Sequence, residues 1–135
     1  MRRYLLDTGT AGDHLDQRHG VHVSVQQATR RGDRVGLCVP VVGELFAGIQ
    51  FSASRDRNEK RLRRVLSALV VWPFDLAAAA EFGRIVAMLR RRGRPMQQID
   101  IQIAAVAKTL GNCTVVTSDT DFDAIPGLKV ENWRE

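Results

Sequence analysis

The sequence contains little cysteine, and this excludes two classes of small protein. Only Cys38 and Cys113 occur, and they form neither a Cys-x-x-Cys pair nor a zinc-binding spacing. Two cysteines cannot build a disulfide framework, so we expect both to be ordinary buried side chains. The three histidines have no metal-binding context either, and we expect them on solvated faces.

Long apolar runs are also absent. A membrane-spanning helix needs about 18 consecutive apolar residues, and the longest candidate, which starts at Ile103, is interrupted by Lys108. Near the start of the chain, the carboxylate of Asp7 comes too early for the apolar region of a signal peptide. We therefore expect a cytoplasmic protein without a membrane span.

The composition is that of a globular protein with an excess of arginine. The 135 residues are 44% hydrophobic and 26% charged, and no internal repeat or linker interrupts them, so we expect a single domain over residues 1–135. The net charge is +5, and every basic residue except Lys60, Lys108 and Lys129 is an arginine. This excess suits a nucleic acid, an acidic protein partner or simply a solvated surface.

Apolar patterning predicts alternating strands and helices. Short apolar runs predict strands at residues 4–6, 35–39, 70–74, 114–117 and 128–130. Helical spacing of apolar residues predicts helices at about 21–31, from Pro40, after Ser54, from Asp75 to about 93, and at 98–110. This alternation indicates an α/β fold with a mostly parallel, short-stranded sheet flanked by helices.

Four carboxylates lie where such a fold places function. Asp7 ends the first strand, Asp119 follows the strand at 114–117, and Glu44 lies early in the helix after the second strand. Asp100 lies in the first turn of its helix. Because ligands of parallel sheets bind at the carboxyl ends of the strands, we expect the four side chains at one edge.

Each carboxylate also has a purely structural interpretation. Asp100 can favour the helix dipole, Asp119 can belong to a turn, and Asp7 can cap the next segment. Four converging carboxylates, however, repel one another and require a compensating cation. Oxygen ligands without histidine or cysteine select Mg²⁺ or Mn²⁺, which suits phosphodiester hydrolysis.

Five segments in order resemble the PIN-domain ribonucleases of the VapC toxin type, over nearly the whole chain. They are YLLDT at 4–8, VPVVGELFAG at 39–48, RGRP at 92–95 followed by Asp100 and IAA at 103–105, VVTSD at 115–119 with DF at 121–122, and IPGL at 125–128 with VENW at 130–133. The resemblance implies a three-layer PIN fold and a Mg²⁺-dependent endoribonuclease, the toxin of a toxin–antitoxin pair. It also implies an RNA substrate, a VapB-type antitoxin partner and a homodimer, for which the apolar, arginine-edged helix around residues 62–69 is a candidate surface.

The resemblance also implies roles for individual residues. The acidic quartet is Asp7, Glu44, Asp100 and Asp119, with Asp7 and Asp100 as direct metal ligands and the hydroxyls of Thr117 and Thr8 in support. Exposed arginines would contact RNA or an acidic antitoxin segment; the candidates are Arg57, Arg61, Arg64, Arg90, Arg91 and Arg92. Two departures from the family pattern concern the site: Gly9 replaces Asn or Ser, and Gln98-Ile99 replaces a frequent Pro-Asn.

Two other functions remain open from the sequence. A PIN nuclease can act in RNA processing without an antitoxin, and the neighbouring reading frame would separate this from a toxin. A non-catalytic RNA- or protein-binding module can keep the same fold. The intact quartet disfavours the module, and a metal-binding titration would decide.

Overall fold

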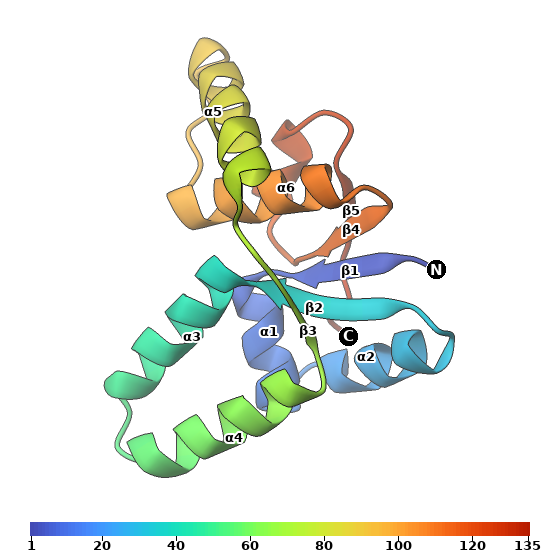
Figure 1. The fold of residues 1–135 in the computed structure, drawn as a ribbon, viewed down its shortest axis with the longest axis vertical. Helices are drawn as coiled ribbons and strands as arrows, with labels where there is room; N and C mark the ends of the chain where they lie inside the picture. Colours follow the sequence, from blue (N-terminus) through green and yellow to red (C-terminus); the bar gives the residue numbers. More distant parts are fainter.

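A computed structural model describes all residues, 1–135, as a five-stranded parallel sheet with helices on both sides (Figure 1). The strands are β1 (Arg3–Leu6), β2 (Arg34–Cys38), β3 (Val70–Trp72), β4 (Cys113–Val116) and β5 (Lys129–Glu131). The helices are α1 (Thr8–Leu15), α2 (Val21–Arg30), α3 (Val39–Gln50), α4 (Arg55–Ser67), α5 (Leu76–Arg91) and α6 (Gln98–Leu110), followed by the short 3₁₀ helix η1 (Thr120–Ala124). The predicted α/β fold is confirmed, and every strand pair is parallel.

The strand order β3-β2-β1-β4-β5 places β1 at the centre of the sheet. Leu5 of β1 pairs with Gly36 on one side and Val115 on the other. Gly36 permits an unusually close approach of β2 to β3, because a Cβ there would lie 2.1 Å from the carbonyl oxygen of Val70. Any larger residue at this position would force the two strands apart.

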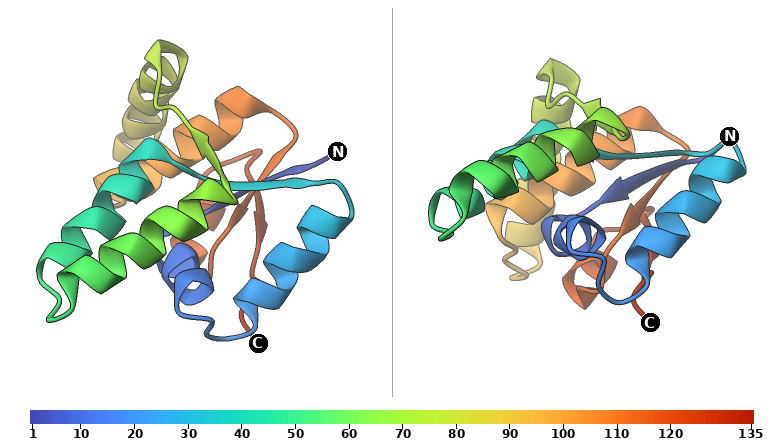
Figure 2. Two further views of the ribbon diagram at one scale, coloured as in Figure 1. Left: turned by 60° about the horizontal axis from the view of Figure 1, so that its bottom comes forward. Right: turned by 90° about the horizontal axis from the view of Figure 1, so that it is seen from below.

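The helices form two layers and a projecting hairpin. Helices α1 and α2 lie on one side of the sheet, and α5 and α6 lie on the other (Figure 1). Helices α3 and α4 form a hairpin that extends beyond the carboxyl ends of the strands, as the two further views show (Figure 2). The start of α3 therefore lies at the same edge as the ends of β1 and β4.

The core consists of the central strands and the inward faces of the helices. Leu5, Leu6 and Leu37 are completely or almost completely buried, and Phe122 of η1 closes the core beside them. Parallel strands covered on both faces are expected to be mainly apolar, and β1 and β2 are so after their first residue, an arginine in each. No helix of the chain is long and apolar enough to cross a membrane.

Both cysteines are buried and unpaired, as predicted. Burial raises the pKa of each thiol to about 11, with Cys38 at the end of β2 and Cys113 at the start of β4. A thiol with so high a pKa is a poor nucleophile and a poor metal ligand near neutral pH. Their role is therefore to fill the core.

Two expectations from the sequence require correction. The first helix was predicted only at about residues 21–31, but Thr8–Leu15 already form α1, which begins on a side-chain cap from Asp7. The apolar face of α4 was expected to be a surface for a second copy, but Leu62 is buried within the chain and Leu66 packs against its core. Leu62 therefore packs inside the fold, where it is not available to a second copy.

The C-terminal residues 132–135 pack against β1 and α1. Trp133 packs against Tyr4 with ring centroids 5.0 Å apart. The Arg134 Nε lies 2.6 Å from an oxygen of Asp13, a carboxylate of α1 that is almost fully buried. Because α1 begins at Asp7, this ion pair fixes the helix that positions the first carboxylate of the predicted site.

Candidate metal-dependent active site

Asp7 occupies the junction between β1 and α1 and is held by two hydrogen bonds. Its Oδ1 accepts from the Thr10 backbone N–H at 2.8 Å, which makes it the N-cap of α1. Its Oδ2 accepts from the Thr117 hydroxyl at 2.5 Å. The side chain is buried, with 8% of its surface exposed. Since a carboxylate offers about four lone-pair positions, these two bonds leave acceptor capacity for a cation.

Thr117 connects the ends of the two central strands. Its hydroxyl donates to Asp7 and accepts from the Asp119 backbone N–H at 2.9 Å. Asp119 in turn accepts from the Asp121 backbone N–H at 2.9 Å and caps η1. The buried Thr117 hydroxyl thus hydrogen-bonds both to the Asp7 carboxylate after β1 and to the backbone of Asp119 after β4.

The pKa of Asp100 reflects the nearby carboxylates. Burial in the first turn of α6 is the largest cause that raises its pKa, followed by the negative charges of Asp119, Asp7, Glu44 and Asp121, in that order. The combined effect moves the pKa from 3.8 to about 6. The charged groups with the largest effects are all carboxylates, and Asp100 forms no ion pair with a basic side chain.

Glu44 is the most open member of the quartet. It lies on an exposed row of α3 with Ala47 and Gly48. Because alanine has a small side chain and glycine has none, this row leaves room for an approaching molecule. The fold therefore brings together all four carboxylates that the sequence selected. It also adds Asp121, which belongs to the resembling segment that ends at residue 122 but was not among the residues selected for the site. The alternating spacing of Asp119 and Asp121 at the end of a strand was the available signal.

The arrangement fits a cation that keeps most of its waters. No group of three or more His, Cys, Asp or Glu side chains lies close enough together to hold a metal ion. Mg²⁺ is normally bound by one or two carboxylates and several waters, so it does not need such a group. The Thr8 hydroxyl, next to Asp7 in sequence, is buried without a hydrogen-bond partner and is available as a further donor or acceptor.

The two departures from the family pattern lie beside the acidic residues. At Gly9 a Cβ would lie 3.9 Å from Asp7 Oδ1, so a side chain at this position would border the Asp7 carboxylate. Because glycine has no side chain, access to that carboxylate is wider. At the second departure, α6 begins at Gln98 without a side-chain capping bond from Gln97. Asp100 still lies in the first turn, so the missing Pro-Asn does not displace it.

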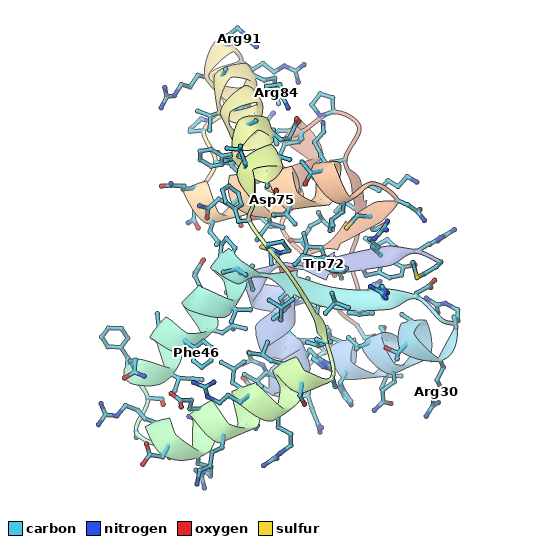
Figure 3. The ribbon with its side chains drawn as sticks, viewed as in Figure 1. Arg30, Phe46, Trp72, Asp75, Arg84 and Arg91 are labelled. Atoms are coloured by element: carbon cyan, nitrogen blue, oxygen red, sulfur yellow. The ribbon has the colours of Figure 1, made fainter.

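The candidate arginines divide into those with partners and those without. Arg61 of α4 binds Asp16, the residue that follows α1, at 2.7 Å, and Arg57 donates to Ser54 at 3.2 Å. The remaining four side chains make no hydrogen bond or ion pair within the chain; they are Arg64, Arg90, Arg91 and Arg92. Figure 3 shows Arg91 at the end of α5 farthest from the sheet. Arg61 is thus a link within the fold, and the unpaired arginines are better candidates for an external anion.

Comparison with known proteins identifies the relatives of this chain. The model of the PIN domain family matches residues 4–128. Ribonuclease VapC2 of Haemophilus influenzae is 30% identical, with 98% of this chain and 99% of the relative aligned. The tRNA(fMet)-specific endonuclease VapC of Salmonella typhimurium is 29% identical, with 98% and 99% aligned. Among solved structures, the DNA-bound VapBC complex of Salmonella typhimurium superposes with a TM-score of 0.90 at 30% identity, covering 98% of this chain and 99% of that one.

Proposed function

This chain belongs to the PIN domain family and, within it, to the VapC ribonucleases, and we propose that the acidic edge of its sheet is where it hydrolyses RNA as the toxin of a toxin–antitoxin pair. The observation that carries the proposal is the gathering of carboxylates from four segments at the carboxyl edge of the sheet. Burial and the carboxylates of three other segments raise the pKa of Asp100, which forms no ion pair within the chain. A divalent metal ion is the partner that such a set of groups fits.

In this proposal Asp7 and Asp100 hold the metal, which is Mg²⁺ or Mn²⁺. When bound, the ion supplies a water of lowered pKa and neutralises charge that develops on the phosphate. Thr117 fixes the orientation of the Asp7 carboxylate through the hydrogen bond described above. Glu44 and Asp119, at the exposed rim, accept hydrogen bonds from water, and one of them orients the attacking molecule.

The antitoxin partner is proposed from the solved relatives, which are complexes of toxin with antitoxin. We expect a VapB-type protein to bind this chain and block access to the acidic edge. The unpaired arginines of α4 and α5 are available to contact the RNA backbone or acidic residues of that protein. We also propose that residues 1–135 act as one domain and that two copies associate, as the resemblance to the VapC ribonucleases implies.

Cleavage of total RNA tests the proposal. Purified protein is incubated with RNA in Mg²⁺, in Mn²⁺ and in EDTA, and the products are end-mapped to find the cleaved step. We expect cleavage with either metal and none in EDTA, and loss of cleavage in Asp7→Asn and Asp100→Asn. Full activity after exhaustive removal of metal would refute the mechanism.

Two alternatives give different results in simple experiments. For an RNA-processing nuclease, no small gene for a DNA-binding antitoxin would adjoin the reading frame, and expression alone would not arrest growth. For a non-catalytic module, titration would detect no divalent metal binding and RNA would remain intact. Metal binding together with cleavage would leave only the nucleases.

A further inference from the structure

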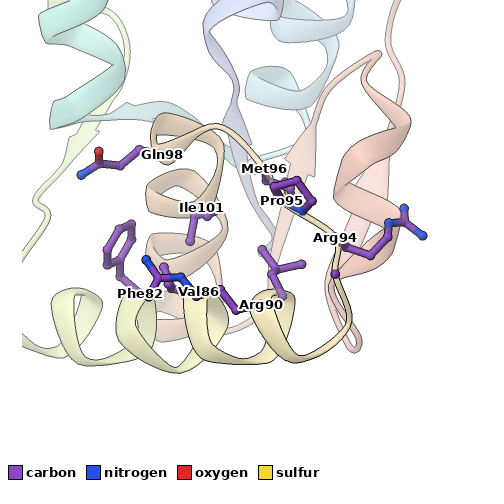
Figure 4. A pocket seen from close by; sticks show the side chains of 10 residues that line it. Phe82, Val86, Arg90, Arg94, Pro95, Met96, Gln98 and Ile101 are labelled. Carbon is purple, nitrogen blue, oxygen red and sulfur yellow. The ribbon is translucent and has the colours of Figure 1, made fainter.

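A cleft of about 640 Å³ lies between α5, α6 and the segment that joins them, outside the acidic site (Figure 4). Apolar side chains from all three form its walls, namely Val86, Leu89, Met96 and Ile101. A volume of this size falls within the range of about 300–1,000 Å³ that is usual for binding sites of small ligands. The cleft is open to solvent, so a strand bound on the surface can reach it.

Phe82 offers a flat apolar surface inside the cleft. Its ring meets Phe74 edge to face, at 6.2 Å between centroids and an interplanar angle of 81°. The contact fixes the orientation of the Phe82 ring, which remains half-exposed. Figure 4 shows Phe82 and Val86 extending from α5 into the space faced by Ile101 of α6. A fixed aromatic ring of this kind is a stacking platform for a nucleobase.

Two arginines border the same cleft. Arg90 and Arg94 both line it, both are exposed, and neither forms an ion pair within the chain. An unpaired guanidinium beside an apolar wall suits a ligand with an apolar part and an anionic part. A nucleotide has both, in its base and its phosphate.

The start of α6 lies between the cleft and the acidic edge. Gln98 lines the cleft at the first position of the helix, and Asp100, two residues later, lies about 200° further round the same turn. A strand whose phosphate lies at Asp100 must therefore pass around the first turn of α6 to reach the cleft. The Gln98 amide offers both a donor and an acceptor for the edge of a base.

We propose that the cleft between α5 and α6 binds one nucleotide of the RNA strand near the scissile phosphate, with its base against Phe82 and its phosphate near Arg90. The proposal rests on the ribonuclease function proposed above and adds to it a subsite that selects position on the strand. The Gln98 amide contributes to the choice of base.

The subsite is tested by combining a substitution in the protein with the omission of a single base from the RNA. The substrate is a synthetic RNA oligonucleotide that spans the mapped cleavage step, compared with versions that lack one base at each flanking position in turn. For the wild type, one such omission should raise KM about tenfold, the effect of losing one stacked base. Phe82→Leu should raise KM for the intact oligonucleotide to a similar extent and should then be insensitive to that omission. The kcat value should change little in both cases.

Matched charge variants examine the rim of the cleft. Arg90→Gln should raise KM and reduce its salt dependence, because a phosphate contact is lost. Arg84→Gln removes the same charge from the same helix outside the cleft, where Arg84 contacts only Glu81, and should leave KM within about twofold. Fluorescence anisotropy of the labelled oligonucleotide in EDTA provides a second measurement that does not depend on cleavage.

The outcomes separate the subsite from the function. One outcome is that the wild type cleaves RNA while the missing base raises KM as much for Phe82→Leu as for the wild type. In that case the subsite is wrong and the proposed nuclease function is unaffected. If Phe82→Leu instead converts a dimer into a 15.1 kDa species and affects all oligonucleotides equally, the cleft is an interface between copies and the subsite is also wrong. If the wild type cleaves no RNA with metal, the proposed function and the subsite both fail.

Discussion

Replacing Asp100 by asparagine should make the metal-free protein more stable while it abolishes cleavage. The substitution removes one negative charge at nearly constant volume, so packing is preserved. The folded protein holds the carboxyl beside three other carboxylates of the proposed site, and its pKa is raised to about 6. The ionised form is therefore a cost to the folded state whenever no cation is bound.

The magnitude of that cost follows from the pKa. A change from 3.8 to about 6 corresponds to about 3 kcal/mol at about 1.36 kcal/mol per pKa unit. Because Asp100 is only half-buried, water screens the field, and we reduce the value to about 1.5 kcal/mol. The variant also loses part of a helix-dipole contribution of about 0.3–1 kcal/mol. A net gain of about 1 kcal/mol at pH 7 remains.

The pH dependence has a defined sign. Between pH 3.8 and about 6 the folded protein binds the Asp100 proton more strongly than the unfolded chain. The wild type should therefore lose stability as pH rises through this window, and its deficit should then stay constant. The variant has no such group, so the two proteins should be equally stable near pH 4 and should differ above pH 6.

Urea unfolding in EDTA from pH 4 to 8 measures this difference. A gain of about 1 kcal/mol moves the urea midpoint by about 0.5 M for a domain of this size. Asp56→Asn is the matched control, since Asp56 also lies in the first turn of a helix but is exposed. The control should lose a few tenths of a kcal/mol and keep its activity.

Two results would refute this reasoning. One is an Asp100→Asn protein that is less stable than the wild type without metal at pH 7 yet still cleaves RNA, because Asp100 would then be only a helix-start residue. The other is a difference in the free energy of unfolding between the two proteins that stays the same over the whole pH range. Adding Mg²⁺ should raise the midpoint of the wild type by mass action and that of the variant much less.

Three further variants and one measurement of size examine other parts of the structure. Thr117→Val removes the hydroxyl that orients Asp7 and should weaken metal binding about 10–100-fold in a titration, with a fold that circular dichroism shows to be intact. Arg134→Ala leaves the buried Asp13 with one weaker partner and should lower the free energy of unfolding by about 2 kcal/mol, and an unchanged urea midpoint would contradict the ion pair. Gly36→Ala places a methyl group against the backbone of β3 and should prevent folding or cost more than about 3 kcal/mol, as expression and thermal melting will show. Light scattering at micromolar concentration should give twice 15.1 kDa, and a monomer would contradict self-association.

Local signals were sufficient for most of the elements. Apolar spacing predicted α6 at Gln98–Leu110 and placed the cap of α5 at Asp75, whose side chain accepts from the Ala78 backbone N–H at 2.9 Å. Both features depend on residues close together in the chain, so the sequence alone contains them. Helix α1 was missed because Thr8–Leu15 includes two glycines and few apolar residues. It is stabilised by the Asp7 cap and by long-range contacts such as that between Asp13 and Arg134.

The sequence by itself determined the α/β class and the four carboxylates, because strand ends and helix starts can be recognised from local pattern. Only the tertiary structure decided how they act on one another. The Thr117 hydroxyl reaches Asp7 across 110 residues of sequence, and the pKa of Asp100 depends on charges from three other segments. The inward direction of the α4 apolar face and the cleft beside Phe82 likewise depend on which elements pack together. Interactions between residues distant in sequence arise from the packing of the whole chain, and no local pattern records them.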